Sequence, residues 1–108
     1  MNPMVALILF VAAAVLEVGG DAIIRKGLRG NAPASIAIGF VMLGCYGLVV
    51  NTVRWDFSRL LGVYVAVFAT VSTFWGLLLF KERVPASTWA GLALIVAGGL
   101  VIQFGQRA

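Results

Sequence analysis

Residues 4–20 read MVALILFVAAAVLEVGG, and the run is uncharged from Met4 to Leu16 before it reaches Glu17. A helix that crosses a bilayer needs roughly 20 predominantly apolar residues, which this stretch provides once its flanks are included. Three further apolar stretches follow, separated by charged residues, glycine and proline. The sequence therefore predicts four membrane-spanning helices, over residues 3–28, 34–53, 60–80 and 86–104.

The composition favours the same fold class. The chain has 108 residues, of which 62% are hydrophobic and 11% charged, whereas a soluble domain is about 45–50% apolar and about 25% charged. Strands of a membrane barrel are about 10 residues long, roughly half the length of these segments. We therefore expect residues 1–108 to form a single all-α integral membrane domain, a four-helix bundle with no room for a catalytic domain. An enzyme is not expected.

The residue inventory excludes several kinds of site. Cys45 is the only cysteine, so no disulfide can form within the chain, and there is no histidine. A histidine-based metal site or catalytic triad is therefore excluded within one chain, and we expect neither metal nor cofactor. Residues 1–15 lack the basic region of a cleaved signal peptide and are interpreted as part of the first helix.

The positive charges point to lipid as a partner. The net charge is +4, and the cations are spread over three loops and the C-terminus. This distribution fits anionic lipid headgroups better than nucleic acid. Lys and Arg in short loops set membrane orientation. One side carries Lys26, Arg29, Lys81 and Arg83, with Arg25 if it reaches the surface. The other carries Arg54, Arg59, Arg107 and the α-amino group. Such a near balance fits either insertion in both orientations or one weakly specified topology.

Glu17 is the residue that the membrane environment explains least. At 1.5 Å per residue it lies about 20 Å from Met4, near the middle of a roughly 30 Å hydrocarbon core. A charged side chain there costs about 2.5–3.5 kcal/mol. Because desolvation disfavours its charged form, the carboxyl can bind a proton or, when ionised, an organic cation. Glu17 is thus the predicted proton- and substrate-binding residue. The alternative is a carboxyl kept neutral or paired for structural reasons.

Two further charges follow Glu17 at successive steps of four residues. Asp21 and Arg25 therefore lie along the same drifting helix face and can form an ion pair. A structural pair is one interpretation. The other makes Asp21 a second proton site or a cation gate that couples to Glu17.

Aromatic and small residues give weaker signals. Aromatic rings attract organic cations, although aromatic stripes more often serve packing. The candidates for substrate binding are Tyr64, Phe68 and Trp75, which share one face of the third segment, and Tyr46 on the second. Small residues let helix backbones approach closely in lipid. The candidate helix–helix seam on the fourth segment consists of Gly91, Gly98, Gly99 and Gly105, with packing inside the chain as the alternative.

These features resemble a known family. An opening Met-Asn-Pro, the sequence Leu16-Glu17-Val18-Gly19-Gly20, and a cation eight residues after Glu17 are similar to the small multidrug resistance (SMR) transporters of the drug/metabolite transporter superfamily. The glycine repeat resembles that family's fourth helix. The third segment, with its continuation Trp89-Ala90-Gly91, looks more like the YnfA-type branch of small four-helix exporters.

The resemblance implies an antiparallel homodimer of dual-topology subunits in the cell inner membrane. It also implies proton-coupled export of hydrophobic, guanidinium or quaternary ammonium cations by alternating access. Glu17 would match the proton- and substrate-binding Glu, and Arg25 the common Lys near the end of helix one. The glycines of the fourth segment would form the dimer seam.

The sequence departs from the SMR pattern in three places. Tyr64 matches only one of the Tyr and Trp usual on helix three, residues 69–72 (ATVS) replace its Gly-Val-Gly-like kink, and Asp21 is an extra acid. These departures leave the substrate open. Two other functions also remain: a half-size flippase or metabolite-transporter subunit with a different partner, and a non-transporting membrane-assembly protein.

Overall fold

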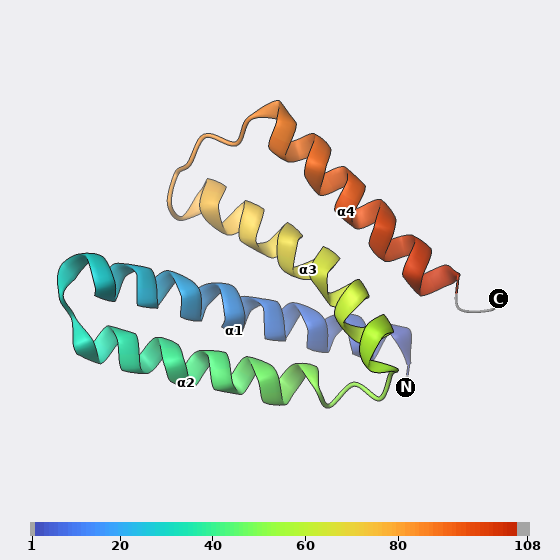
Figure 1. Ribbon diagram of the computed structural model, residues 1–108, viewed down its shortest axis with the longest axis horizontal. Coiled ribbons are helices and arrows are strands. Elements are labelled where there is room, and N and C mark those ends of the chain that lie inside the picture. The colour runs from blue at the N-terminus through green and yellow to red at the C-terminus, as the bar shows by residue number, and fades with distance from the viewer. Residues whose placement is uncertain (1, 106–108) are drawn as a thin grey trace. The chain divides into compact units, whose positions relative to one another are not determined.

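The structure is a computed structural model that describes residues 2–105. These residues form four α-helices and contain no strand (Figure 1). Each helix is long and apolar enough to cross a membrane. The predicted all-helical, four-span fold class is therefore confirmed. The helices are α1 (Pro3–Gly30), α2 (Pro33–Val50), α3 (Phe57–Leu78) and α4 (Ala86–Phe104).

Helix α1 is capped at both ends by asparagine. The Asn2 side chain accepts a hydrogen bond from the Met4 N–H at 2.8 Å, and Pro3 occupies the first helical turn. At the other end Asn31 adopts a left-handed conformation with φ 51°, and its N–H donates to the Gly27 carbonyl. Because the cap lies at Asn31, α1 ends at residue 30 rather than at the predicted residue 28.

Helix α2 ends three residues earlier than predicted, because its last carbonyl groups are taken by side chains. The Asn51 side-chain amide donates to the Gly47 carbonyl at 2.8 Å, and the Thr52 hydroxyl donates to the Val49 carbonyl at 2.6 Å. These bonds satisfy carbonyl groups of the last helical turn, so the helix can end there and the loop can begin. The shorter α2 is followed by an earlier α3, which covers residues 57–78 instead of 60–80.

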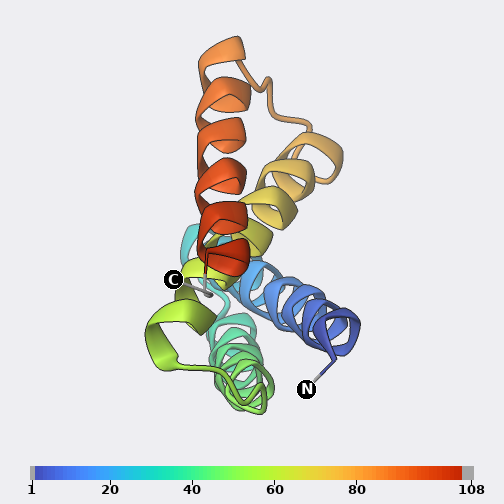
Figure 2. The same cartoon turned by 90° about the vertical axis from the view of Figure 1, so that its right-hand side faces the viewer.

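The chain divides into two compact units, each a helical hairpin. The first ends at Arg54 and contains α1 and α2, and the second starts at Trp55 and contains α3 and α4. Figures 1 and 2 show that the two helices of each hairpin run antiparallel and side by side. Short connections between long helices impose this arrangement.

The α1–α2 hairpin is held by backbone-to-backbone contact at glycine. A Cβ atom added to Gly20 would lie 3.0 Å from the Gly39 carbonyl oxygen, and one added to Gly39 would lie 2.8 Å from the Gly20 carbonyl oxygen. Gly27 packs in the same way, because its Cβ would lie 3.0 Å from the Ala32 oxygen. Glycine is needed at these positions because the two backbones meet there.

Substitution of Gly39 by alanine is expected to destabilise the protein by about 1–3 kcal/mol, because the added methyl group overpacks this contact. Gly44→Ala on the same helix is the matched control, since a Cβ there meets nothing within 4 Å. It should be neutral or gain up to about 1 kcal/mol from helix propensity. Unfolding in mixed detergent–SDS micelles measures both, and equal stabilities for the two variants would contradict the packing described here.

The α3–α4 hairpin packs small residues against larger ones. A Cβ added to Gly62 would lie 2.7 Å from Ile102, and one added to Gly99 would lie 2.7 Å from the Ala66 methyl carbon. Nearer the connecting loop, the rings of Phe74 and Trp89 meet edge to face with centroids 5.6 Å apart. These contacts fix which face of α4 turns towards α3.

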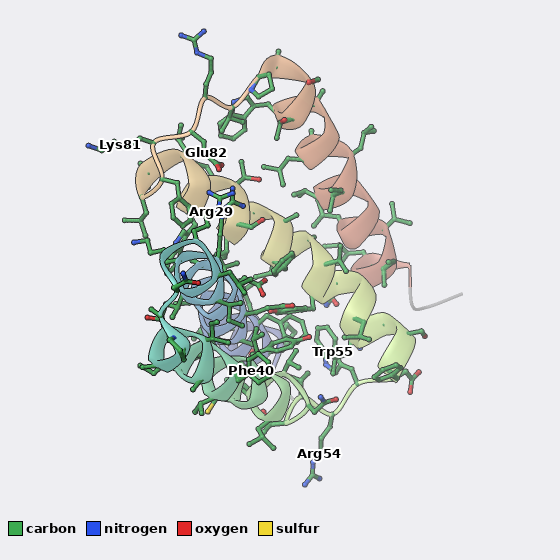
Figure 3. The ribbon with its side chains drawn as sticks, turned by 60° about the vertical axis from the view of Figure 1, so that its left-hand side comes forward. Arg29, Phe40, Arg54, Trp55, Lys81 and Glu82 are labelled. Atoms are coloured by element: carbon green, nitrogen blue, oxygen red, sulfur yellow. The ribbon has the colours of Figure 1, made fainter. Side chains whose placement is uncertain are left out.

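The loop between α3 and α4 folds back over the end of α3. Lys81 adopts a left-handed conformation with φ 53°, and the Glu82 N–H donates to the Gly76 carbonyl at 3.0 Å. The Glu82 carboxyl group covers Gly76, where any side chain would collide with it. Figure 3 shows Lys81 pointing outward while Glu82 turns back towards the helix.

Candidate functional site

Glu17 lies at the middle of α1. The helix spans Pro3–Gly30, so at 1.5 Å per residue Glu17 is about 20 Å from either end. Its side chain is half-buried, and it takes part in an interaction with the rest of the protein. A carboxyl group this far from both ends of a spanning helix needs a polar partner or a polar cavity.

Tyr46 on α2 lies within electrostatic reach of Glu17. The two side chains interact electrostatically within the α1–α2 hairpin, and Tyr46 is half-buried. The helix register explains the pairing: Gly20 packs against Gly39 and Leu43, so the preceding turn of α1 faces the following turn of α2. A phenol can donate a hydrogen bond to a carboxylate and can also present an aromatic face to a cation.

Asp21 and Arg25 are both exposed on α1. Within residues 2–105 no ion pair joins them, although their spacing allows one. Both therefore present their charges outward in this conformation. The two interpretations of Asp21, structural pairing or a coupling role, remain predictions.

The aromatic candidates on α3 share one face, as their spacing predicts. Tyr64 is buried, and its ring centroid lies 6.3 Å from that of Phe68 with a tilt of 37°. Trp75 is half-buried two turns further along the helix. Because Tyr64 is buried, the half-buried Phe68 is the more accessible ring of this pair for an organic cation.

Three hydroxyl groups bond to the backbone in the middle of α3, and the sequence did not single them out. Thr70 donates to the Ala66 carbonyl at 2.8 Å, and Thr73 and Ser72 both donate to the Ala69 carbonyl, at 2.7 and 3.1 Å. Side-chain bonds of this kind compete with the helical ladder and often bend helices. They occupy the stretch in which SMR transporters usually carry a glycine-rich kink.

The predicted glycine seam on α4 divides into different environments. Gly99 is buried against Ala66 of α3, as in the alternative of packing within the chain. Gly105 is the C-cap of α4, and its N–H donates to the Val101 carbonyl at 2.8 Å. A Cβ at Gly91 or Gly98, by contrast, would meet nothing within 4 Å. Of the four glycines, Gly91 and Gly98 thus lie on the open face of α4.

A second polar cluster lies where α3 begins and α4 ends. The Arg59 guanidinium carbon is 3.8 Å from the centroid of the Trp55 ring, and Arg59 donates to the Gln103 side-chain oxygen at 2.9 Å. The spacing of four residues between Trp55 and Arg59 could have indicated the first contact, but Gln103 is distant in sequence. Elsewhere, residues 2–105 contain no group of His, Cys, Asp and Glu that could hold a metal ion, and Cys45 is exposed on α2.

Residues 4–108 match a family model described as "Uncharacterised BCR, YnfA/UPF0060 family". A UPF0060 membrane protein from Frankia casuarinae is 35% identical, over 94% of this chain and 94% of the relative. One from Mycobacterium marinum is 34% identical, over 95% and 96%. The UPF0060 membrane protein YfjF from Bacillus subtilis is 29% identical, over 96% and 97%. No solved structure matches the chain significantly.

Proposed function

Because the chain belongs to the YnfA/UPF0060 family of membrane proteins, we propose that it is a small transporter that exchanges protons for a cationic substrate. The observation that carries this proposal is the Glu17 carboxyl group at the middle of α1, within electrostatic reach of Tyr46. The YnfA part of the predicted resemblance is confirmed by the family match. Kinship with the SMR transporters and proton-coupled antiport belong to the proposal.

In the proposed mechanism, Glu17 holds either a proton or a cation. When the carboxyl group is ionised, it attracts a cation into a region of low dielectric, where the attraction is strong. Arrival of the cation is coupled to loss of the proton, and a proton from the other side of the membrane releases the cation. The Tyr46 hydroxyl can donate a hydrogen bond to the ionised form and hold the carboxylate in place.

The substrates proposed are hydrophobic, guanidinium or quaternary ammonium cations. Such ions combine a positive charge with apolar surface, which suits a carboxylate assisted by aromatic rings. On α3, the half-buried Phe68 stays a candidate for such a contact, whereas Tyr64 is buried. Reconstituted protein should take up a cation of this class when a pH gradient is imposed. A non-transporting assembly protein would show no flux driven by the gradient.

We further propose that the transporter works as an antiparallel homodimer of dual-topology subunits in the inner membrane. The open face of α4 at Gly91 and Gly98 supports this, because small residues allow another helix to approach closely. A half-size subunit that pairs with a different chain could use the same face.

A cysteine on α4 separates the two assemblies. Leu94, which is 75% exposed, lies one turn from Gly98, and Leu94→Cys in a Cys45→Ala background should form a disulfide-linked dimer on oxidation of the purified protein. Ala93→Cys is the matched control, because this exposed position lies on a different side of α4. Cross-linking at neither position, or equally at both, would contradict a homodimer seam at this face.

A further inference from the structure

The cluster of Trp55, Arg59 and Gln103 has no part in the proposed transport chemistry. Trp55 precedes α3, Arg59 lies in its first turn, and Gln103 lies in the last turn of α4, so all three belong to the same hairpin. The guanidinium group stacks on the indole at 3.8 Å and donates one hydrogen bond to Gln103 at 2.9 Å. Arg59 is thereby fixed in orientation.

One donor of the guanidinium group nevertheless lacks an acceptor. Arginine carries five N–H donors, and the Nε atom of Arg59 is buried without a hydrogen-bond partner. No acid among residues 2–105 forms an ion pair with Arg59. Asp56, three residues away, is exposed, and its side chain makes no capping bond to α3. The positive charge is thus held in place while one buried donor remains unsatisfied.

The position of the cluster indicates which hydrogen-bond acceptor is available to Arg59. It lies where one membrane-spanning helix begins and another ends, which is the depth of the lipid headgroups. Indole rings concentrate at this depth. The first N–H groups of α3 have no side-chain cap, so the start of the helix also favours negative charge. Phosphate groups are the acceptors that a bilayer supplies there.

We propose that the Trp55–Arg59–Gln103 cluster binds the phosphate group of an anionic phospholipid. A planar guanidinium matches phosphate geometry, and stacking on Trp55 with the bond to Gln103 orients it in advance. An anionic lipid suits the site better than a zwitterionic one, because the charge of Arg59 is uncompensated and a choline headgroup brings its own cation. The bound phosphate compensates the charge of the guanidinium group that already links the start of α3 to the end of α4.

Native mass spectrometry of the purified full-length protein tests this. Delipidated protein is offered phosphatidylglycerol and phosphatidylcholine of equal chain length, and the wild type is expected to retain phosphatidylglycerol about tenfold better. Arg59→Gln should lose that preference. Arg54→Gln is the matched control: it removes the same charge five residues earlier, in the connection before α3, where Arg54 is exposed and extends outward (Figure 3). It should keep the preference.

Each other outcome overturns the proposal. Equal retention of the two lipids by the wild type would overturn the proposal. This comparison needs no variant, so it remains decisive even if Arg59→Gln fails to fold. Equal losses in Arg54→Gln and Arg59→Gln would mean diffuse attraction to basic loops. Full retention of phosphatidylglycerol by Arg59→Gln would exclude the Trp55–Arg59–Gln103 cluster as the binding site. Displacement of the lipid by inorganic phosphate at equal concentration would assign the site to soluble anions instead.

Discussion

Replacement of Glu17 by glutamine is expected to abolish proton-coupled transport while leaving the protein folded and inserted. Glutamine keeps the size and hydrogen-bonding shape of the side chain but cannot bind and release a proton near neutral pH. It also removes the negative charge that would attract a cation to the middle of α1. We expect cation flux driven by a pH gradient to fall to the level of empty proteoliposomes, because no other group on the proposed route exchanges one ion for the other.

Asp21→Asn is the matched control for this variant. It makes the same chemical change one turn away on the same helix, at a position that is exposed. Transport should survive in Asp21→Asn and fail in Glu17→Gln, with both proteins recovered at wild-type levels and equal thermal stability. Loss of flux in both variants would favour the interpretation of Asp21 as a second proton site. Wild-type flux in Glu17→Gln would rule out the mechanism.

Removal of the Tyr46 hydroxyl is expected to have the second largest effect. Tyr46→Phe keeps the ring and its packing on α2 but takes away the hydroxyl group, which could donate a hydrogen bond to the nearby Glu17 carboxylate. Because a hydrogen bond to a charged group contributes about 1.5–3 kcal/mol, the affinity for the cation should fall about tenfold or more. Titration of a fluorescent or radiolabelled cation into detergent-solubilised protein measures this directly.

Tyr46→Leu distinguishes the hydroxyl from the ring. If the ring also contacts the cation, the leucine variant should bind more weakly than the phenylalanine variant. If the hydroxyl alone matters, the two variants should match. Wild-type affinity in both would mean that the Glu17–Tyr46 interaction plays no part in substrate binding.

The fold class was predictable because a lipid bilayer restricts which structures can span it. Four long apolar stretches separated by charges allow little other than four spanning helices. The helix ends were predicted only to within three residues, because capping decides them. Asn31 extends α1 by adopting a left-handed conformation, while Asn51 and Thr52 end α2 early by bonding to its last carbonyl groups. The hydropathy pattern does not reveal the cap at Asn31 or the side-chain bonds that end α2.

The candidate site was predictable in part. Glu17 stands out because it interrupts an apolar run, but its pairing with Tyr46 depends on the register of α1 against α2. That register is set by the contact between Gly20 and Gly39, which no single-helix periodicity reveals. Likewise, neighbouring glycines on a helix point about 100° apart, so a repeat alone could not tell that Gly99 faces α3 while Gly98 lies open.

The most direct test of the central claim is the proton release that accompanies cation binding. Guanidinium, quaternary ammonium and aromatic cations are added in turn to the weakly buffered, detergent-solubilised wild type and to Glu17→Gln. If Glu17 exchanges a proton for a cation, at least one class of cation should acidify the wild-type solution and none should acidify the Glu17→Gln solution. Equal proton release from the two proteins, or binding to the wild type without any release, would contradict the account.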